Sequence, residues 1–388
     1  MPALLEIHMP SFCAICEVPI TAANDTAEHV IPQSIGGRRT VSGFICRSCN
    51  SEAGSTWDSE LFHQHHWFTV MLGIKRQRGP APDIRIEALE GVTYAVSSAG
   101  AMTHAAPLVK RSEDGKSFQI RARDLDEAKQ LVRQIHKRHP TFDVADVLSG
   151  IEFSSAPADT VMKTSFGFGG DLAGRSMVKT VMALAYSLGL PPASCDLALR
   201  YLRGDPSVEP SLAEHLVSDL IVDRPARIFN CVSVLGDSRT RRLVGYVEYF
   251  GICRWVIHLS TSYDGPDVRD TYCLDAISGE GMDLDVNLAL SNEEFQASMD
   301  NLTSDEQQRA ATFHAIMPLV MARRTELGRE ALVDHAITAA TTAMGLSAGS
   351  PLDDFQLKEF SGRVARYLAE NLVFRGRGNA PWNQKIPG

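Results

Sequence analysis

The spacing of apolar residues divides the chain into a short N-terminal segment, a strand-rich middle and a helical C-terminal third. Apolar and polar residues alternate within 83–123 and at about 228–235, 243–250 and 252–259, which predicts antiparallel strands. Apolar residues at helical spacing predict helices at about 50–72, 124–140, 173–189, 292–300, 304–323, 325–345 and 353–372. The predicted fold class is therefore α+β.

The order of these elements and a few breaker residues predict the domain organisation. The stretch RGPAP at 78–82 interrupts the pattern and is typical of a boundary. We expect four parts: an N-terminal domain at 1–78, a larger mixed α+β body at 79–290, a helical region at 291–375 and a tail at 376–388. The body carries no second catalytic motif, so we expect recognition, regulation or assembly from it.

Two Cys-x-x-Cys pairs are the most specific feature of the N-terminal part. The pairs are Cys13 with Cys16 and Cys46 with Cys49. Each pair at this spacing directs two sulfurs toward one point, and four thiolates hold zinc at about 2.3 Å in a closed tetrahedral site. The pattern predicts one structural zinc. Zinc would also compensate for the small apolar core of so short a segment.

The two cysteine pairs enclose residues that suit hydrolysis of a phosphodiester bond. Glu28 and His29 lie between the pairs, and Asn50 follows the last cysteine. A neutral histidine can accept a proton from water, whereas a carboxylate and an amide oxygen are ligands that Mg²⁺ or Mn²⁺ prefers. Asp58 lies about two helical turns after Asn50, so both side chains could share one helix face.

The segments EHVIPQSIGG and FICRSCNSEAGSTWD resemble the HNH, or ββα-metal, endonucleases, in the zinc-knuckle type that is similar to phage endonuclease VII. The resemblance covers roughly 10–75 and implies an N-terminal ββα domain. It implies that His29 is the general base, that Glu28 and Asn50 bind the catalytic Mg²⁺ or Mn²⁺, and that Asp58 is a further ligand or orients His29. The family usually has Asp where this chain has Glu28, and Asp58 stands near the last position of the signature, with His63 further on.

Charge and composition limit the partners. The 388-residue chain has a net charge of −9, which excludes a broadly basic nucleic-acid binder but not a local patch. Basic residues flank the motif, at Arg38 and Arg39 and at Lys75, Arg76 and Arg78, and they could contact phosphates. By contrast, 264–306 holds twelve acidic residues against one arginine. We expect no transmembrane helix and no secretory signal, and a cytoplasmic protein with Cys195, Cys231, Cys253 and Cys273 as buried free thiols.

The resulting hypothesis is a metal-dependent endonuclease. DNA is the expected substrate and RNA the alternative, and restriction or phage defence is an expectation by analogy. Double-strand cleavage by one site per chain favours a homodimer or larger assembly.

Two other functions stay open. The zinc module could bind nucleic acid or act as a scaffold without catalysis. The chain could also be a nuclease effector whose body binds a small nucleotide signal, for which the glycine-rich stretch at 165–175 and the pair Arg175 and Lys179 are the indications.

Overall fold

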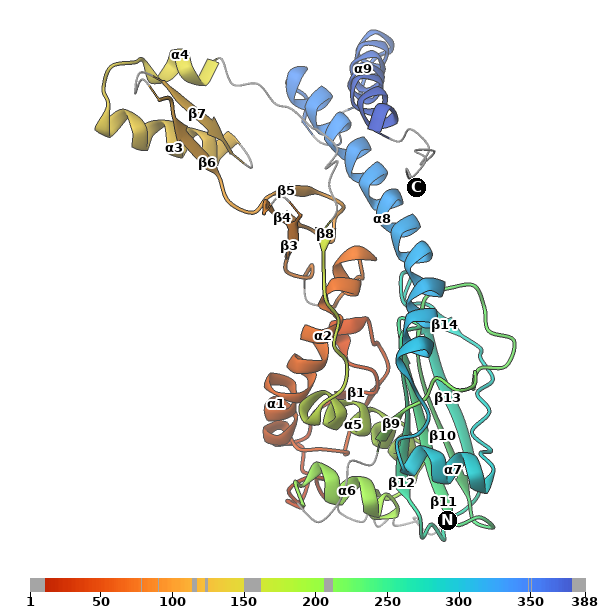
Figure 1. Ribbon diagram of the computed structural model, residues 1–388. Helices are drawn as coiled ribbons and strands as arrows, with labels where there is room; N and C mark the ends of the chain where they lie inside the picture. The colour runs from red at the N-terminus through yellow and green to blue at the C-terminus, as the bar shows by residue number, and fades with distance from the viewer. Residues whose placement is uncertain are drawn as a thin grey trace, which may run out of the picture. The chain divides into compact units, whose positions relative to one another are not determined.

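The computed structural model describes residues 11–77, 79–89, 91–113, 117–122, 125–149, 162–205, 212–347, 349 and 351–378 (Figure 1). The chain forms two compact units. The first joins Met1–Ala81 to Phe166–Arg323, and the second joins Pro82–Ser165 to Arg324–Gly388. The predicted α+β class is confirmed. The domain boundaries at 78 and 290 remain predictions, and Arg78 and the part of the predicted tail beyond residue 378 lie outside the described residues.

The N-terminal segment forms a small ββα element. Its parts are β1 (Glu28–His29), η1 (Gln33–Ile35), β2 (Thr40–Val41), α1 (Arg47–Ser55) and α2 (Trp57–Met71). The strands β1 and β2 pair antiparallel, and the connection between them contains η1. Gly37 is required in this connection, because a Cβ there would lie 1.7 Å from the Ile31 carbonyl oxygen. The single helix predicted at 50–72 is wrong: the chain bends at Thr56, whose φ of −115° and ψ of −76° separate α1 from α2.

The remainder of the first unit is a six-stranded antiparallel sheet with helices. The strand order is β14-β13-β10-β11-β12-β9. The strand bounds are β9 (Leu212–Glu214), β10 (Phe229–Asp237), β11 (Arg242–Tyr249), β12 (Cys253–Ser260), β13 (Val268–Asp275) and β14 (Gly281–Met282). The three strands predicted between 228 and 259 are thus confirmed. The helical elements are α5 (Asp171–Ser187), η2 (Pro192–Ser194), α6 (Asp196–Leu202) and α7 (Asn292–Met299).

Helix α5 lies between the ββα element and the sheet (Figure 1). It packs on α2, β1 and β2 on one side and on β10, β11 and β12 on the other. Nearly all its residues from Ala173 to Ala185 are buried, as expected for a helix with apolar residues all round. Gly245 of β11 permits the close approach, since a Cβ there would lie 2.1 Å from Val181 Cγ1. The six-stranded sheet and the ββα element therefore pack on opposite sides of the same buried helix, α5.

The second unit contains a four-stranded sheet and a separate hairpin. The sheet order is β5-β4-β3-β8, and β6 pairs with β7. The bounds are β3 (Ile84–Ala88), β4 (Thr93–Val96), β5 (Met102–His104), β6 (Leu108–Arg111), β7 (Phe118–Arg121), α3 (Leu125–Arg138), α4 (Val144–Ser149) and β8 (Met162–Lys163). The strands expected within 83–123 are confirmed.

Two long helices complete the chain, α8 (Glu306–Ala343) and α9 (Asp354–Gly378). Two separate helices at 304–323 and 325–345 were predicted, and this is wrong. Neither glycine nor proline occurs at 323–325, so nothing ends the helix there, and α8 continues through these positions. No helix in the described part of the chain is both long and apolar enough to cross a membrane.

A buried histidine of α2 is expected to make the fold sensitive to acid. His65 of α2 is 1% exposed and packs against Phe168, Tyr249 and Phe250. Burial lowers its pKa from 6.5 to about 4, despite a contact between its Nδ1 and the Leu61 carbonyl. In the unfolded chain the same group takes up a proton below pH 6.5. Stability contributed by neutral His65 is therefore present above pH 6.5 and lost as the pH falls toward 4.

We expect His65→Met to reduce this acid sensitivity. Methionine fills a similar volume without titrating. Between pH 7 and 4.5 the wild-type free energy of unfolding should fall more steeply than that of the variant, by a difference on the order of 2–3 kcal/mol. Urea unfolding at both pH values measures it. His63→Met, at an exposed site on the same helix, should keep the wild-type slope; equal slopes for all three proteins would contradict the prediction.

Candidate active site

Four cysteines converge at one end of the ββα element. The Sγ atoms of Cys13, Cys16, Cys46 and Cys49 all lie within 4.8 Å of one another. Cys13 and Cys16 lie on a tight turn closed by the Glu17 N–H, which donates to the Cys13 carbonyl at 2.9 Å. Cys46 is the N-cap of α1 and Cys49 lies in its first turn. Among the described residues, no other group of three or more His, Cys, Asp or Glu side chains converges in this way.

The surroundings of the thiols fit a metal. The Cys46 N–H points to Cys13 Sγ at 3.3 Å, and Cys16 Sγ lies 3.7 Å from Cys46 Sγ. Although burial opposes ionisation, backbone N–H groups of Cys16, Cys46 and Ile15 lower the pKa of the Cys13 thiol to about 7. Burial raises the pKa of Cys49. The cluster is consistent with a structural zinc, because four sulfurs leave no ligand position open for substrate.

The side chains of the two residues that form β1 point in opposite directions. Successive side chains of a strand alternate between its faces, so Glu28 points inward and is 4% exposed, whereas His29 is half-buried. His29 Nε2 lies 3.3 Å from Oε1 of the exposed Gln77. The predicted base thus lies at the protein surface, and the predicted carboxylate ligand lies in the interior.

Lys179 of α5 inserts between two of the predicted metal ligands. Its ammonium group donates to Glu28 Oε1 in a very short contact and to Asp58 Oδ2 at 2.8 Å. Ser176, one turn earlier on α5, donates to Asp58 Oδ1 at 2.6 Å. Lys179 is 1% exposed, and its contacts bring together residues 151 and 121 positions apart in sequence.

The buried carboxylates keep Lys179 charged. Burial alone would lower the pKa of its ammonium group, but Asp58 and Glu28 raise it above its ordinary value. Burial raises the pKa of Glu28, and the adjacent ammonium counteracts only part of this effect. The group of three charges is held in place because any one of them would be costly to bury alone.

The remaining donors decide whether a hard cation fits. Both Asp58 oxygens are engaged, one by Ser176 and one by Lys179. The Lys179 contact with Glu28 uses Oε1, and Oε2 receives no hydrogen bond from the described residues. Asn50 Nδ2 donates to Thr26 Oγ1 at 3.0 Å, which directs its carbonyl oxygen elsewhere. The chemistry of Glu28 Oε2 and Asn50 Oδ1 suits Mg²⁺ or Mn²⁺, whereas Asp58 holds Lys179.

Most basic residues flanking the motif make internal contacts. Arg39 pairs with Asp270 of the acidic segment at 3.4 Å and donates to Ser187 at 3.0 Å. Arg38 donates to the Ser278 carbonyl at 3.1 Å. Arg76 lies over the Phe62 ring, with its Cζ atom 5.2 Å from the ring centre. Asp270 of the acidic segment thus neutralises one of the basic residues that flank the motif.

The two basic residues predicted to bind an anion together on α5 are occupied separately. Lys179 holds Glu28 and Asp58, whereas Arg175 pairs with Asp171 at 3.1 Å and donates to the Leu202 carbonyl at 3.1 Å. Cys195, Cys231, Cys253 and Cys273 are buried free thiols, as expected. Of the three α2 histidines, His65 is buried and His63 is exposed.

Sequence reasoning did not assign Lys179, Ser176 or Gln77 to the site. The available signal was the helical spacing of Arg175 and Lys179, which marked two cations on one face but not the carboxylates they meet. A contact over 151 positions has no local signature.

These features define the N-terminal segment as a ββα element with a four-cysteine cluster. In a sequence comparison, residues 13–66 match the family described as HNH endonuclease, a phosphodiesterase family. Residues 13–66 are therefore an HNH endonuclease domain. No curated protein and no solved structure matches the chain. Similarity to the phage endonuclease VII type remains a prediction.

Cys16→Ser should remove the bound zinc. Cys16 is exposed, so its replacement by serine changes packing little while removing one of four ligands. Purified wild-type protein should contain one zinc per chain, and the variant much less, with a lower midpoint of thermal unfolding because metal binding stabilises the folded segment. Elemental analysis measures this. Cys195→Ser, at a buried thiol outside the cluster, should retain zinc; wild-type protein without zinc would refute the assignment.

Lys179→Met should destabilise the first unit strongly. The change leaves the Glu28 and Asp58 carboxylates without their counter-ion, which costs about 3–5 kcal/mol for a buried pair. Urea unfolding followed by tryptophan fluorescence reports on this unit, since Trp57, Trp67 and Trp255 belong to it. Lys75→Met changes an exposed lysine of the same unit and should cost less than about 1 kcal/mol.

A second substitution separates lost charge balance from lost packing. Adding Glu28→Gln and Asp58→Asn to Lys179→Met neutralises the stranded carboxylates and should recover much of the stability. Losses of equal size for Lys179→Met and Lys75→Met would show that the charged group does not hold the unit together.

Proposed function

We propose that this protein is a metal-dependent endonuclease that cuts DNA at the ββα element, with His29 as the general base. The observation that carries the proposal is the family match over 13–66 together with the arrangement of β1 and α1 around His29 and Asn50. His29 is half-buried beside the exposed Gln77, so water and a phosphodiester can reach it.

The proposed roles follow from what each side chain can do. His29 takes the proton from the attacking water, and Gln77 orients the imidazole ring by contact with Nε2. Glu28 Oε2 and Asn50 Oδ1 are the proposed ligands of the catalytic Mg²⁺ or Mn²⁺. That ion, when bound, supplies Lewis-acid stabilisation of charge on the phosphate and the leaving oxygen. Asp58 acts through Lys179, which fixes the Glu28 carboxylate in one orientation.

The wider biological role rests on analogy and chemistry. DNA is proposed because most enzymes with this motif pattern cut DNA, and RNA remains the alternative substrate. Restriction or phage defence in the cytoplasm is the proposed setting. Twofold assembly would supply a second site for the opposite strand, and α9 presents Phe355 at 76% and Leu357 at 52% exposure as a candidate contact.

His29→Ala should abolish cleavage while leaving the fold intact. The base acts in the chemical step, so its loss should slow nicking by a factor of about 10²–10⁴. The assay follows conversion of supercoiled plasmid to nicked and linear forms with added Mg²⁺ or Mn²⁺. Zinc content and the unfolding midpoint should match the wild type.

His63→Ala is the matched control, because His63 is exposed on α2 and lies beyond the last signature position. It should cut at close to the wild-type rate. Cleavage by His29→Ala at the wild-type rate would exclude His29 as the base. Loss of activity in His63→Ala but not in His29→Ala would transfer the role to α2.

A further inference from the structure

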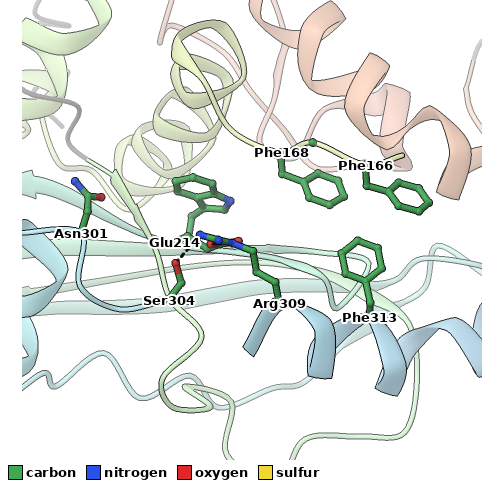
Figure 2. Close-up of a pocket in the computed structure, with 9 residues that line it drawn as sticks. Phe166, Phe168, Glu214, Asn301, Ser304, Arg309 and Phe313 are labelled. Carbon is green, nitrogen blue, oxygen red and sulfur yellow. Dashed lines mark hydrogen bonds and ion pairs between the residues drawn. The ribbon is translucent and has the colours of Figure 1, made fainter. Parts of the chain in front are cut away.

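A pocket of about 380 Å³ lies in the first unit, and none of the residues that line it is assigned to catalysis (Figure 2). Three phenylalanines, Phe166, Phe168 and Phe313, gather on one side of it, and Arg309, Ser304 and Glu214 lie on the other. Its volume falls at the lower end of the range for small-molecule sites. The pocket thus has an aromatic wall and a polar wall.

The aromatic wall consists of side chains that the fold leaves half-exposed. Phe166 and Phe168 have nearly parallel rings, at 8° with centroids 6.4 Å apart, and the Phe313 ring lies 5.2 Å from that of Phe166. Trp255 of β12 also lines the pocket and is half-exposed. Several aromatic faces left partly open in one cavity favour a flat ligand, because stacking covers their apolar surface.

The polar wall offers both donors and acceptors. Arg309 Nε donates to Glu214 Oε2 at 2.6 Å and its Nη2 to Ser304 Oγ at 3.0 Å, yet the arginine side chain remains 51% exposed. The Glu214 carboxylate and the Ser304 hydroxyl are acceptors on the same wall, so a ligand edge meets both donors and acceptors there.

The pocket is connected to the nuclease segment. Gln64 of α2 holds Gly169 at both backbone groups, accepting from its N–H at 3.0 Å and donating to its carbonyl at 2.8 Å. The Phe166 ring packs on Trp67 and Phe68 of the same helix, with centroid distances of 5.1 and 5.3 Å. Gly169 is required here, since a Cβ would lie 2.8 Å from the Trp255 ring.

We propose that this pocket binds a nucleobase, stacked on the phenylalanine rings with its polar edge toward Glu214 and Ser304 and its phosphate toward Arg309. A nucleobase combines a flat aromatic ring with donors and acceptors on its edge, and the attached phosphate suits an exposed guanidinium. The base can belong to a free nucleotide or to a base extruded from nucleic acid. The proposal concerns recognition, and so it goes beyond cleavage at His29.

Binding is measured with full-length zinc-loaded His29→Ala protein and no added Mg²⁺ or Mn²⁺, so that catalysis does not enter the result. The probes are the four common nucleoside monophosphates, ribose 5-phosphate, and a labelled single-stranded oligonucleotide with or without one central abasic position. Tryptophan fluorescence follows the small ligands, and anisotropy follows the oligonucleotides. A ligand with a base should bind more tightly than its counterpart without one.

Phe313→Ala should weaken that binding roughly tenfold, the size expected for loss of one stacking partner, and Phe313→Leu should restore packing but not affinity. Phe118→Ala is the control, because Phe118 is also half-buried but does not line the pocket. Arg309→Ala should weaken binding as well, whereas Arg363→Ala, at a helix-surface pair with Glu359, should not.

The outcomes separate the two sources. Tight binding of monophosphates identifies a free nucleotide, whereas binding of the oligonucleotide that drops at the abasic position identifies a base of nucleic acid. Equal affinity with and without a base, or no effect of Phe313→Ala and Arg309→Ala, would overturn the proposal. Failure of the plasmid assay would leave these titrations unaffected, and so the two proposals fail separately.

Discussion

The first unit depends on one ammonium group buried between two carboxylates. Lys179 reaches from the central helix α5 to Glu28 on β1 and Asp58 on α2, so it joins both parts of the ββα element to the helix that also covers the sheet. In a low-dielectric interior such a group is stable only when all its members are present, because each charge loses its hydration and regains it through its partners. The contact therefore fixes geometry more than it adds net stability, and the geometry it fixes is that of the proposed site.

The four-cysteine cluster and Lys179 both stabilise the ββα element, the cluster within the element and Lys179 from the neighbouring helix α5. The cysteines close the chain between the first turn and α1, and polar contacts attach the outside of the element to the rest of the unit. Asn230 donates to the Ile35 carbonyl at 2.8 Å, and Arg203 donates to the Ala14 carbonyl at 2.9 Å. A segment this short buries too little apolar surface to hold a catalytic arrangement alone. Glu28 has one methylene more than the aspartate usual in this family, and that reach is consistent with one carboxylate oxygen on Lys179 and the other directed away.

The same two helices serve both the nuclease site and the aromatic pocket. Helix α2 contributes Asp58 to the lysine contact and Gln64 to the loop that carries Phe166 and Phe168, and that loop leads directly into α5. A ligand on the phenylalanine wall would therefore contact a loop held by the nuclease helix. Packed elements transmit displacement because protein interiors are dense, so the proposed base pocket and the proposed cleavage site share a physical connection.

The sequence by itself determined the features with a local signature. The cysteine spacing predicted the cluster, the EHVIP stretch predicted the ββα element, and alternating residues predicted β10, β11 and β12 close to their observed bounds. Tertiary structure alone decided that Lys179 meets Glu28 and Asp58, that Arg39 pairs with Asp270 rather than facing solvent, and that Phe313 joins Phe166. These contacts link positions more than a hundred residues apart. Periodicity and spacing report only which face of an element is buried, and the partner across that face is chosen by how the elements pack.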